Sequence, residues 1–183
     1  MSEELLVRHC SPTLAGMKTG NMFSCSCRSR EDVKNYVRAM NRLLNGRGLR
    51  VLPLKCEKGH ALIYVYRPDR LSDDLREDLA VEILASCGYT SKDPTKCLIR
   101  LMKRLKAEEG FPHEIGLFLG YPPEDVRGFI EYGAQNYKCV GAWKVYGDEE
   151  AAKQLFAKYR RCTEIYEKRF RHGSTLEQLT VRS

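Results

Sequence analysis

Hydrophobic residues recur at the spacing of one α-helix face in four long stretches of the chain. The clearest covers residues 33–44 and is preceded by Ser29, which stands where a capping box would place it. Similar patterns follow Ser72 and Asp93 and predict two more helices, each with a capping residue at its start. The fourth stretch, residues 149–170, predicts a long C-terminal helix that packs on the rest of the domain.

Shorter apolar runs predict strands. LLVRHC (5–10) suits a short strand, and NMFSCSC (21–27) suits another because apolar residues alternate there with small polar ones. LRVLPLKC (49–56) and ALIYVYR (61–67) are joined by EKGH, and this arrangement predicts a β-hairpin. Pro53 indicates that the first hairpin strand has an edge position or a bulge, since proline cannot donate to a ladder.

These elements predict an α+β protein in which a small mixed or antiparallel sheet of about 4–5 strands accompanies about 6–7 helices. A single hairpin and an irregular order of elements argue against a doubly wound parallel sheet. The 183 residues suffice for an ordinary core, and no repeat or linker interrupts them. We therefore predict one domain over residues 1–183, with a tail at 173–183 that could be loose.

Composition places the chain among globular proteins, with 43% hydrophobic and 30% charged residues. No apolar run approaches the roughly 20 residues that span a bilayer. The N-terminal MSEELLVRHC is acidic and lacks the apolar core of a secretory signal. We therefore expect a cytoplasmic protein without a membrane partner.

The formal net charge of +7 is concentrated near the C-terminus. Between Lys153 and Arg171 the predicted helix carries seven Lys or Arg against Glu164 and Glu167. Such a helix indicates either a solvated face or a surface for nucleic acid or another polyanion.

Eight cysteines are many for a cytoplasmic chain, in which thiols stay reduced. None has the Cys-x-x-Cys spacing of zinc or iron–sulfur sites, and Cys87 and Cys97 are expected as small core residues. The side chains that could ligate a metal without a diagnostic spacing are His9, Cys10, Cys25, Cys27 and His113.

Residues 111–133, FPHEIGLFLGYPPEDVRGFIEYG, predict two short helices joined by a tight turn. Pro112 and Pro123 suit first helical turns, and Gly120 suits the end of the first helix. Segment 112–132 also has the outline of a DNA-binding helix-turn-helix, whose second helix must present donors to bases and phosphates. The second helix instead carries three acidic residues and one arginine, and DNA phosphates would repel its acidic side chains. Two packed helices are therefore favoured.

His113 and Glu114 stand at the expected start of the first of these helices, where backbone N–H groups favour anions. An imidazole at that position could act as an acid, a base or a metal ligand. Alternatively, Glu114 stabilises the helix start and His113 bonds locally. Adjacent helix residues point about 100° apart, so the two need not serve one site.

A second candidate site lies in HCSPTLAGMKTGNMF (9–23). Ser11 as N-cap and Pro12 in the first turn predict a short helix that stops near Gly20. A polar, glycine-punctuated turn of this kind can hold a phosphate or carboxylate through backbone N–H groups, although it lacks the spacing of a Walker loop. The candidate ligand-binding residues here are Ser11, Thr13, Lys18, Thr19 and Asn21.

Cys10 beside His9 suggests a thiolate nucleophile, although neighbours on a strand face opposite ways. The alternative is a capped connector with one buried cysteine. The third candidate, GAWKVYG (141–147), predicts a strand in which Trp143 belongs to the core and Lys144 could meet an anion. The candidate catalytic residues are therefore His113, Glu114, His9 and Cys10.

Three segments, HCSPTLAGMKTGNMF, FPHEIGLFLGYPPEDV-x-GFI and G-x-WKVYG, together resemble a bacterial family known as a domain of unknown function, DUF3793, which is common in anaerobic Firmicutes. The resemblance extends over nearly the whole chain, including YVYRP at 64–68 and the stretch 162–173. It implies one intact cytoplasmic domain and carries no catalytic role with it. An anaerobic host would fit the abundance of free thiols.

The sequence thus favours a small anionic-ligand-binding or enzymatic domain, with a site between the 9–21 turn and the 113–114 helix start. Lys18 and Lys144 would supply positive charge. One alternative is a nucleic-acid-binding or adaptor protein that uses the helix-turn-helix-like segment or the basic C-terminal helix. Another is a thiol- or metal-dependent redox protein. Catalysis, cofactor and oligomeric state are not predicted.

Overall fold

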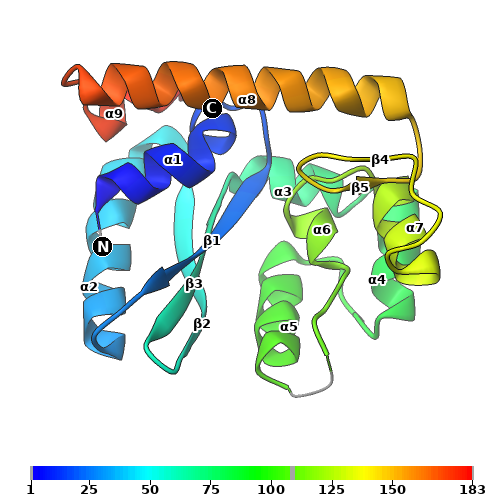
Figure 1. The fold of residues 1–183 in the computed structure, drawn as a ribbon. Coiled ribbons are helices and arrows are strands. Elements are labelled where there is room, and N and C mark those ends of the chain that lie inside the picture. The colour runs from blue at the N-terminus through cyan, green and yellow to red at the C-terminus, as the bar shows by residue number, and fades with distance from the viewer. Residues whose placement is uncertain (1, 108–109, 183) are drawn as a thin grey trace. The chain divides into compact units, whose positions relative to one another are not determined.

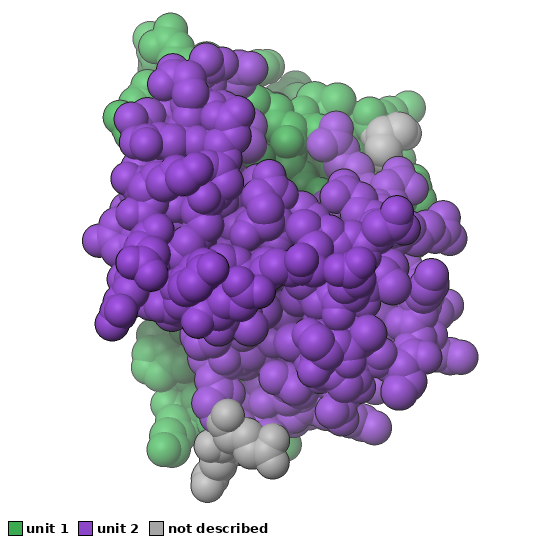
Figure 2. All heavy atoms as spheres, turned by 90° about the vertical axis from the view of Figure 1, so that its right-hand side faces the viewer, with its two compact units in different colours: residues 1–69, 159–183 green, residues 70–158 purple. Residues whose placement is uncertain are grey.

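The computed structural model of the chain describes residues 2–107 and 110–182 (Figure 1). Its contacts divide the chain into two compact units, which Figure 2 distinguishes by colour. Unit 1 comprises residues 1–69 and 159–183, and unit 2 comprises residues 70–158. The boundaries fall within α3 (Pro68–Asp74) and α8 (Glu149–Arg171), and each unit is described by itself.

Unit 1 contains a three-stranded antiparallel sheet with the order β1-β3-β2. Its strands are β1 (Gly20–Ser26), β2 (Arg50–Glu57) and β3 (His60–Tyr66). The predicted hairpin is confirmed, with Lys58 and Gly59 at positive φ in its turn. The predicted irregularity at Pro53 is confirmed as well, because the β2–β3 register shifts between Pro53 and Lys55 on an edge strand.

One face of this sheet forms the core of unit 1. Helices α1 (Glu3–Leu14), α2 (Arg30–Leu44) and α9 (Leu176–Leu179) pack on it (Figure 1). A short 3₁₀ turn, Asn45–Arg47, follows α2. The sheet contributes small and β-branched side chains with one phenylalanine, namely Phe23, Val51, Ala61, Ile63 and Val65. Helix α2 contributes its predicted apolar stripe of Val33, Tyr36, Val37, Met40 and Leu44.

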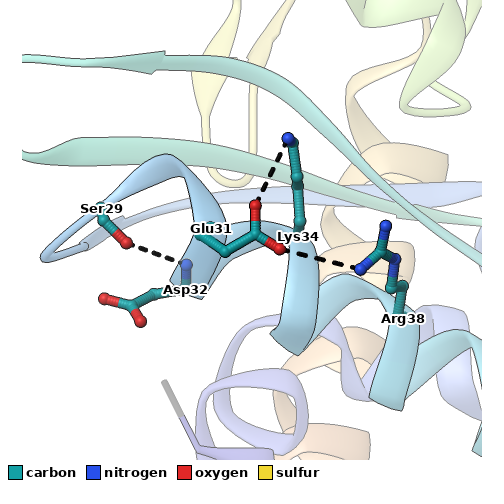
Figure 3. Close-up of polar contacts among 5 residues, drawn as sticks. All are labelled: Ser29, Glu31, Asp32, Lys34 and Arg38. Carbon is teal, nitrogen blue, oxygen red and sulfur yellow. Dashed lines mark hydrogen bonds and ion pairs between the residues drawn. The ribbon is translucent and has the colours of Figure 1, made fainter.

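The start of α2 follows the prediction closely. The Ser29 hydroxyl accepts a hydrogen bond from the Asp32 backbone N–H at 3.1 Å (Figure 3). Glu31 lies 3.4 Å from the Lys34 ammonium and 3.8 Å from the Arg38 guanidinium (Figure 3). All three charged side chains are exposed, so these ion pairs add little stability, and α2 depends mainly on its buried stripe.

The predicted elements at the N-terminus are wrong. The chain forms neither a strand at 5–10 nor a separate helix at 11–20, but one helix, α1, with Ser11 and Pro12 inside it. The Ser11 hydroxyl donates to the Val7 carbonyl rather than capping a helix. Pro12 lies within the last turn of the helix, where its missing N–H costs a single backbone hydrogen bond. Buried residues at helical spacing, Leu6, Val7, Cys10 and Leu14, stabilise this helix against the sheet.

A buried arginine closes the end of α1. Arg67 follows β3 and is 2% exposed. Its Nε donates to the Thr13 carbonyl at 2.9 Å, and one terminal nitrogen donates to the Leu14 and Val181 carbonyls at 2.9 and 2.8 Å. The carbonyls at a helix C-terminus lack intrahelical partners and favour positive charge. The guanidinium therefore joins the sheet, the end of α1 and the C-terminal segment.

The C-terminal segment, expected as a tail that could be loose, packs in unit 1. Thr175 and Gln178 form a capping box at the start of α9, whose Leu176 and Leu179 are buried. The Thr180 carbonyl accepts a hydrogen bond from Arg47 at 3.0 Å, and the Val181 N–H donates to the Leu14 carbonyl at 3.0 Å.

Unit 2 is built mainly from helices. It contains α4 (Asp78–Ser86), α5 (Pro94–Lys106), α6 (Ile115–Phe118), α7 (Pro123–Tyr132) and the first part of α8. A small antiparallel pair, β4 (Cys139–Val140) and β5 (Lys144–Val145), completes it. Asp93 caps α5 as predicted, accepting from the Lys96 N–H at 2.9 Å. The helix predicted to start at Ser72 is wrong, because Ser72 lies inside α3 and a break precedes α4.

The predicted α+β class is confirmed, as are the antiparallel sheet and the long C-terminal helix. The described residues contain nine α-helices, two more than the largest number expected. One extra helix arises because α3 and α4 are separate, and the other is the short C-terminal helix α9. That residues 1–183 form one domain stays a prediction.

We expect Arg67→Ala to lower the free energy of unfolding by about 3 kcal/mol, since the buried Thr13 and Leu14 carbonyls and the partly buried Val181 carbonyl would lose a charged donor. Arg67→Lys should recover only part of this loss, because an ammonium cannot reproduce the planar fork. Arg38→Ala, which removes an exposed arginine, is the matched control and should cost less than about 0.5 kcal/mol. Urea denaturation of the three variants measures the effect, and equal midpoints for Arg67→Ala and Arg38→Ala would contradict it.

Candidate functional site

The carboxylate of Asp125 organises unit 2. This residue lies in the first turn of α7 and is 3% exposed. Its Oδ1 accepts hydrogen bonds from the backbone N–H groups of Tyr146 and Gly147 at 2.7 and 2.8 Å, and its Oδ2 accepts from the Trp143 indole at 2.7 Å. Three donors satisfy the buried charge, so the strand segment 143–147 is fixed against α7.

Glycines allow the close packing around this carboxylate. A Cβ atom at Gly116 would lie 2.7 Å from the Val126 side chain, and one at Gly128 would overlap the Tyr146 ring. Real Cβ atoms do not approach other side chains as closely as this in either case. The two glycines are therefore required by the approach of α6 to α7 and of α7 to the strand segment.

A cavity of about 330 Å³ lies within unit 2. This volume is at the lower end of the range for small-molecule sites. Aromatic and aliphatic side chains form most of the wall, with the imidazole of His113 and the ammonium-bearing Lys144 among them. The lining includes His113, Tyr121, Asp125, Phe129, Trp143 and Lys144.

The aromatic rings of the wall are held in place by one another. Trp143 stacks on Tyr121 with ring centroids 4.5 Å apart and meets Phe156 edge-on at 4.6 Å. His113 meets Phe129 edge-on at 4.8 Å. Offset and edge-on pairs of this kind are favourable, and they give the cavity a defined shape without a ligand.

Lys144 is the only lysine among the described residues that line this cavity. Its Nζ lies 5.7 Å from the Phe129 centroid and 5.2 Å from the Tyr137 centroid. The side chain is half-buried, and these cation–π contacts hold its ammonium beside the aromatic wall. His113, which is exposed, brings a second polar group to the same cavity.

Glu114 has a structural role that the sequence did not specify. It is buried, its Oε1 lies 2.7 Å from the Arg104 Nε, and it accepts a hydrogen bond from the Tyr89 hydroxyl at 3.0 Å. Burial and the neighbouring Glu114 charge raise the pKa of Tyr89, which therefore stays a donor. Glu114 does not line the cavity, although it is adjacent to His113. The predicted pair is thus divided between two roles.

The candidate residues of the 9–21 segment lie in unit 1. The Thr13 hydroxyl donates to the Asn21 Oδ1 at 2.7 Å, and the Thr19 carbonyl accepts from the Arg67 N–H at 2.9 Å. Lys18 is buried, and its burial lowers its pKa to about 8. The segment is the end of a helix and not a start, so it presents carbonyls, to which Arg67 donates. The helix start on which the expected anion cradle was based does not lie in the 9–21 segment, because α1 begins at Glu3.

His9 and Cys10 also lie on α1, and they face different surroundings. The His9 ring stacks on Phe23 at 5.3 Å, and partial burial, followed by the charge of Arg8, lowers the pKa of the imidazole. Cys10 is fully buried, and this burial raises the pKa of its thiol well above the usual range. Such an environment is typical of a core cysteine and not of a nucleophile. That His9 and His113, which belong to different units, serve one site stays a prediction.

The proposed metal ligands do not form a cluster. Within residues 2–107 and 110–182, no group of three or more His, Cys, Asp or Glu side chains is arranged to hold a metal ion. Cys25, whose thiol donates to the Ala61 carbonyl at 3.8 Å, lies on the sheet of unit 1. Cys27 contacts Cys56 instead.

The helix-turn-helix-like segment is confirmed as two short helices, α6 and α7, with Pro123 in the first turn of α7. Every residue of α6 is buried. On α7, Asp125 is engaged by Trp143, and Arg127 pairs with Glu82. The single arginine of this segment therefore already has a carboxylate partner.

The comparison with protein families identifies the class to which this architecture belongs. The model of the family described as "Protein of unknown function (DUF3793)" matches residues 6–180. The chain therefore belongs to the DUF3793 family. The comparisons with curated proteins and with solved structures gave no match. In the part of the chain that the structure describes, no helix is long and apolar enough to cross a membrane.

Of the six lining residues named above, Asp125, Tyr121 and Phe129 were not singled out from the sequence. Asp125 looked like one of several surface carboxylates on an acidic helix, and Trp143 like a core residue. The sequence feature that could have indicated Asp125 is the segment GAWKVYG. Its tryptophan and its final glycine both supply N–H groups that donate to this carboxylate.

We expect Asp125→Ala to destabilise the chain by about 2–4 kcal/mol, because two backbone N–H groups and one indole N–H would lose their acceptor. Trp143 is the one tryptophan of the sequence, so its emission reports the same change. A shift to longer wavelength should accompany the loss as the indole becomes hydrated. Glu131→Ala, an exposed carboxylate on the same helix, is the control, and an unchanged spectrum for Asp125→Ala would contradict the role.

Proposed function

We propose that this protein binds a small organic anion with an aromatic or apolar body in the unit 2 cavity. The observation that carries this proposal is an aromatic-walled cavity of about 330 Å³ with Lys144 and His113 on its lining. The proposal keeps the anionic ligand expected from the sequence and two of its candidate residues, His113 and Lys144. It bases the site on these two residues and not on the 9–21 segment.

The wall supports a ligand with one ring. Trp143 and Phe129 offer faces or edges to a flat apolar group, since both belong to fixed aromatic pairs. Binding such a group displaces water from apolar surface at little ordering cost, because the side chains are already positioned.

The charges support an anion. Both oxygens of Asp125 already accept hydrogen bonds, and the three N–H donors stabilise its negative charge. The carboxylate therefore does not need the Lys144 ammonium as a partner. The Lys144 ammonium has donors left for a carboxylate or phosphate, and the imidazole of His113 can add another. A catalytic role for His113 as acid or base would build on the same placement.

The binding proposal is tested by titrating Trp143 fluorescence with phenylacetate, phenylacetamide and phenethylamine, which differ in charge on one scaffold. We expect a saturable change with phenylacetate and weaker responses with the neutral and cationic probes. Lys144→Met should weaken phenylacetate binding about tenfold, because one charge-assisted hydrogen bond is lost.

Lys92→Met, which removes an exposed lysine of unit 2, is the matched control and should bind like the parent protein. Tighter binding of phenethylamine than of phenylacetate would overturn the proposal, and so would the absence of a saturable response to all three probes.

A second candidate function follows from the basic part of α8. Arg160, Arg161, Lys168 and Arg169 are all exposed on this helix. Glu164 and Glu167 lie between these basic residues, but the excess of positive charge still attracts polyanions and favours the alternative of a nucleic-acid-binding surface. By contrast, the segment 112–132 offers no comparable set of exposed cations.

For this alternative, we expect binding of single-stranded RNA to weaken as salt concentration rises. Changing the four residues to Gln should reduce the slope of log affinity against log salt by roughly 3. The matched control changes four exposed lysines of unit 2 to Gln, which are Lys92, Lys96, Lys103 and Lys106. If both quadruple variants lower affinity equally, the effect reflects net charge and the surface on α8 is not a binding site.

A further inference from the structure

Two cysteines of unit 1, one directly after β1 and one on β2, touch each other. The Sγ atoms of Cys27 and Cys56 lie 3.7 Å apart, which is van der Waals contact for two sulfurs. Cys27 follows β1, and its N–H donates to the Gly59 carbonyl at 2.8 Å. Cys56 lies near the end of β2, opposite Ala61 of β3. The β3 residue opposite Cys56 is the small Ala61, which leaves room for the two thiols to meet.

Both thiols are accessible. Cys27 and Cys56 are partly exposed, unlike Cys10 and Cys97, which are buried. They line an open pocket of about 270 Å³, whose charged lining residues are the basic Arg28, Arg30 and Lys58 and the acidic Glu57. Positive charge around a thiol pair attracts anionic reagents. Desolvation, followed by the contact with Cys56, raises the pKa of the Cys27 thiol, so attack on a reagent should speed up as the pH rises.

We propose that Cys27 and Cys56 form a thiol modification site, at which a low-molecular-weight disulfide oxidises the pair to an intramolecular disulfide. One protein thiolate attacks a sulfur of the reagent, and the first small thiolate leaves. The second protein thiolate then attacks the mixed disulfide and releases the second small thiolate. The two cysteines lose two electrons and their two protons, and the reagent is reduced to two thiols.

Closing the bond requires local movement. The sulfurs must approach from 3.7 Å to about 2.0 Å. Side-chain rotation and the β2–β3 turn at Lys58 and Gly59 have to supply this change. Thiol–disulfide exchange runs in both directions, so an excess of a small thiol should reduce the bond again.

Cys25 provides an internal control. It belongs to β1 and lies opposite the same Ala61, and its thiol donates to the Ala61 carbonyl at 3.8 Å. The proposal therefore assigns the bond to Cys27 and Cys56. It gives the thiol hypothesis drawn from the sequence a specific pair, and it is independent of the cavity in unit 2.

The test treats the full chain, purified under reducing conditions, with glutathione disulfide under native conditions. Free thiols are then counted with Ellman's reagent after denaturation, alongside intact mass. We expect two fewer titratable thiols than the eight of the reduced chain and a mass loss of two hydrogens. Addition of reduced glutathione should restore all eight.

Trypsin leaves Cys25 and Cys27 in one peptide, residues 19–28, and Cys56 in another. Peptide mapping alone therefore does not distinguish Cys25 from Cys27, and variants are used to locate the bond. Cys27→Ser and Cys56→Ser should each abolish the mass loss and accumulate a mixed disulfide with glutathione. Cys25→Ser should form the disulfide as the parent protein does. Loss of the bond in Cys25→Ser, or its persistence in Cys27→Ser or Cys56→Ser, would overturn the assignment, as would eight free thiols in the treated parent protein.

Discussion

A buried charge must be surrounded by hydrogen-bond partners, and this constraint organises both units of the protein. In unit 1 the charge is the guanidinium of Arg67, and in unit 2 it is the carboxylate of Asp125. Each reaches segments far away in the sequence, Thr13 and Val181 in the first case and Trp143 in the second. Because an unpaired buried charge costs several kcal/mol, these segments cannot move away without losing the fold around them.

The candidate site is a consequence of the second of these charges. Asp125 holds the strand segment that begins at Trp143, and Lys144 is the next residue of that segment. The tryptophan provides apolar wall and the lysine provides charge, so one hydrogen-bonded carboxylate positions both kinds of recognition. Glu114 acts in a similar way near His113, since its bonds to Arg104 and Tyr89 fix the turn that carries the imidazole.

The stretches that carry the family resemblance are those that make these contacts. FPHEIGLFLGYPPEDV-x-GFI contains His113, Glu114 and Asp125, and G-x-WKVYG contains Trp143 and two of the N–H donors to Asp125. HCSPTLAGMKTGNMF contains the carbonyls that accept from Arg67 of YVYRP. Segments that seemed to suggest chemistry therefore owe much of their character to architecture, and His113 and Lys144 are the two predicted site residues that line the cavity of unit 2.

The sequence by itself determined the elements whose signals are local. Helices α2 and α5 follow from a capping residue and an apolar stripe, the β2–β3 hairpin from a turn that accepts positive φ, and α8 from its length of periodic pattern. Tertiary structure decided the rest, because the deciding partners are distant in the chain. Residues 5–10 became helix through contact with the sheet, Asp125 acquired its role from Trp143, and Cys27 met Cys56 across β3. Burial and long-range hydrogen bonds have no local sequence signature, and they are what separates a structural polar residue from a functional one.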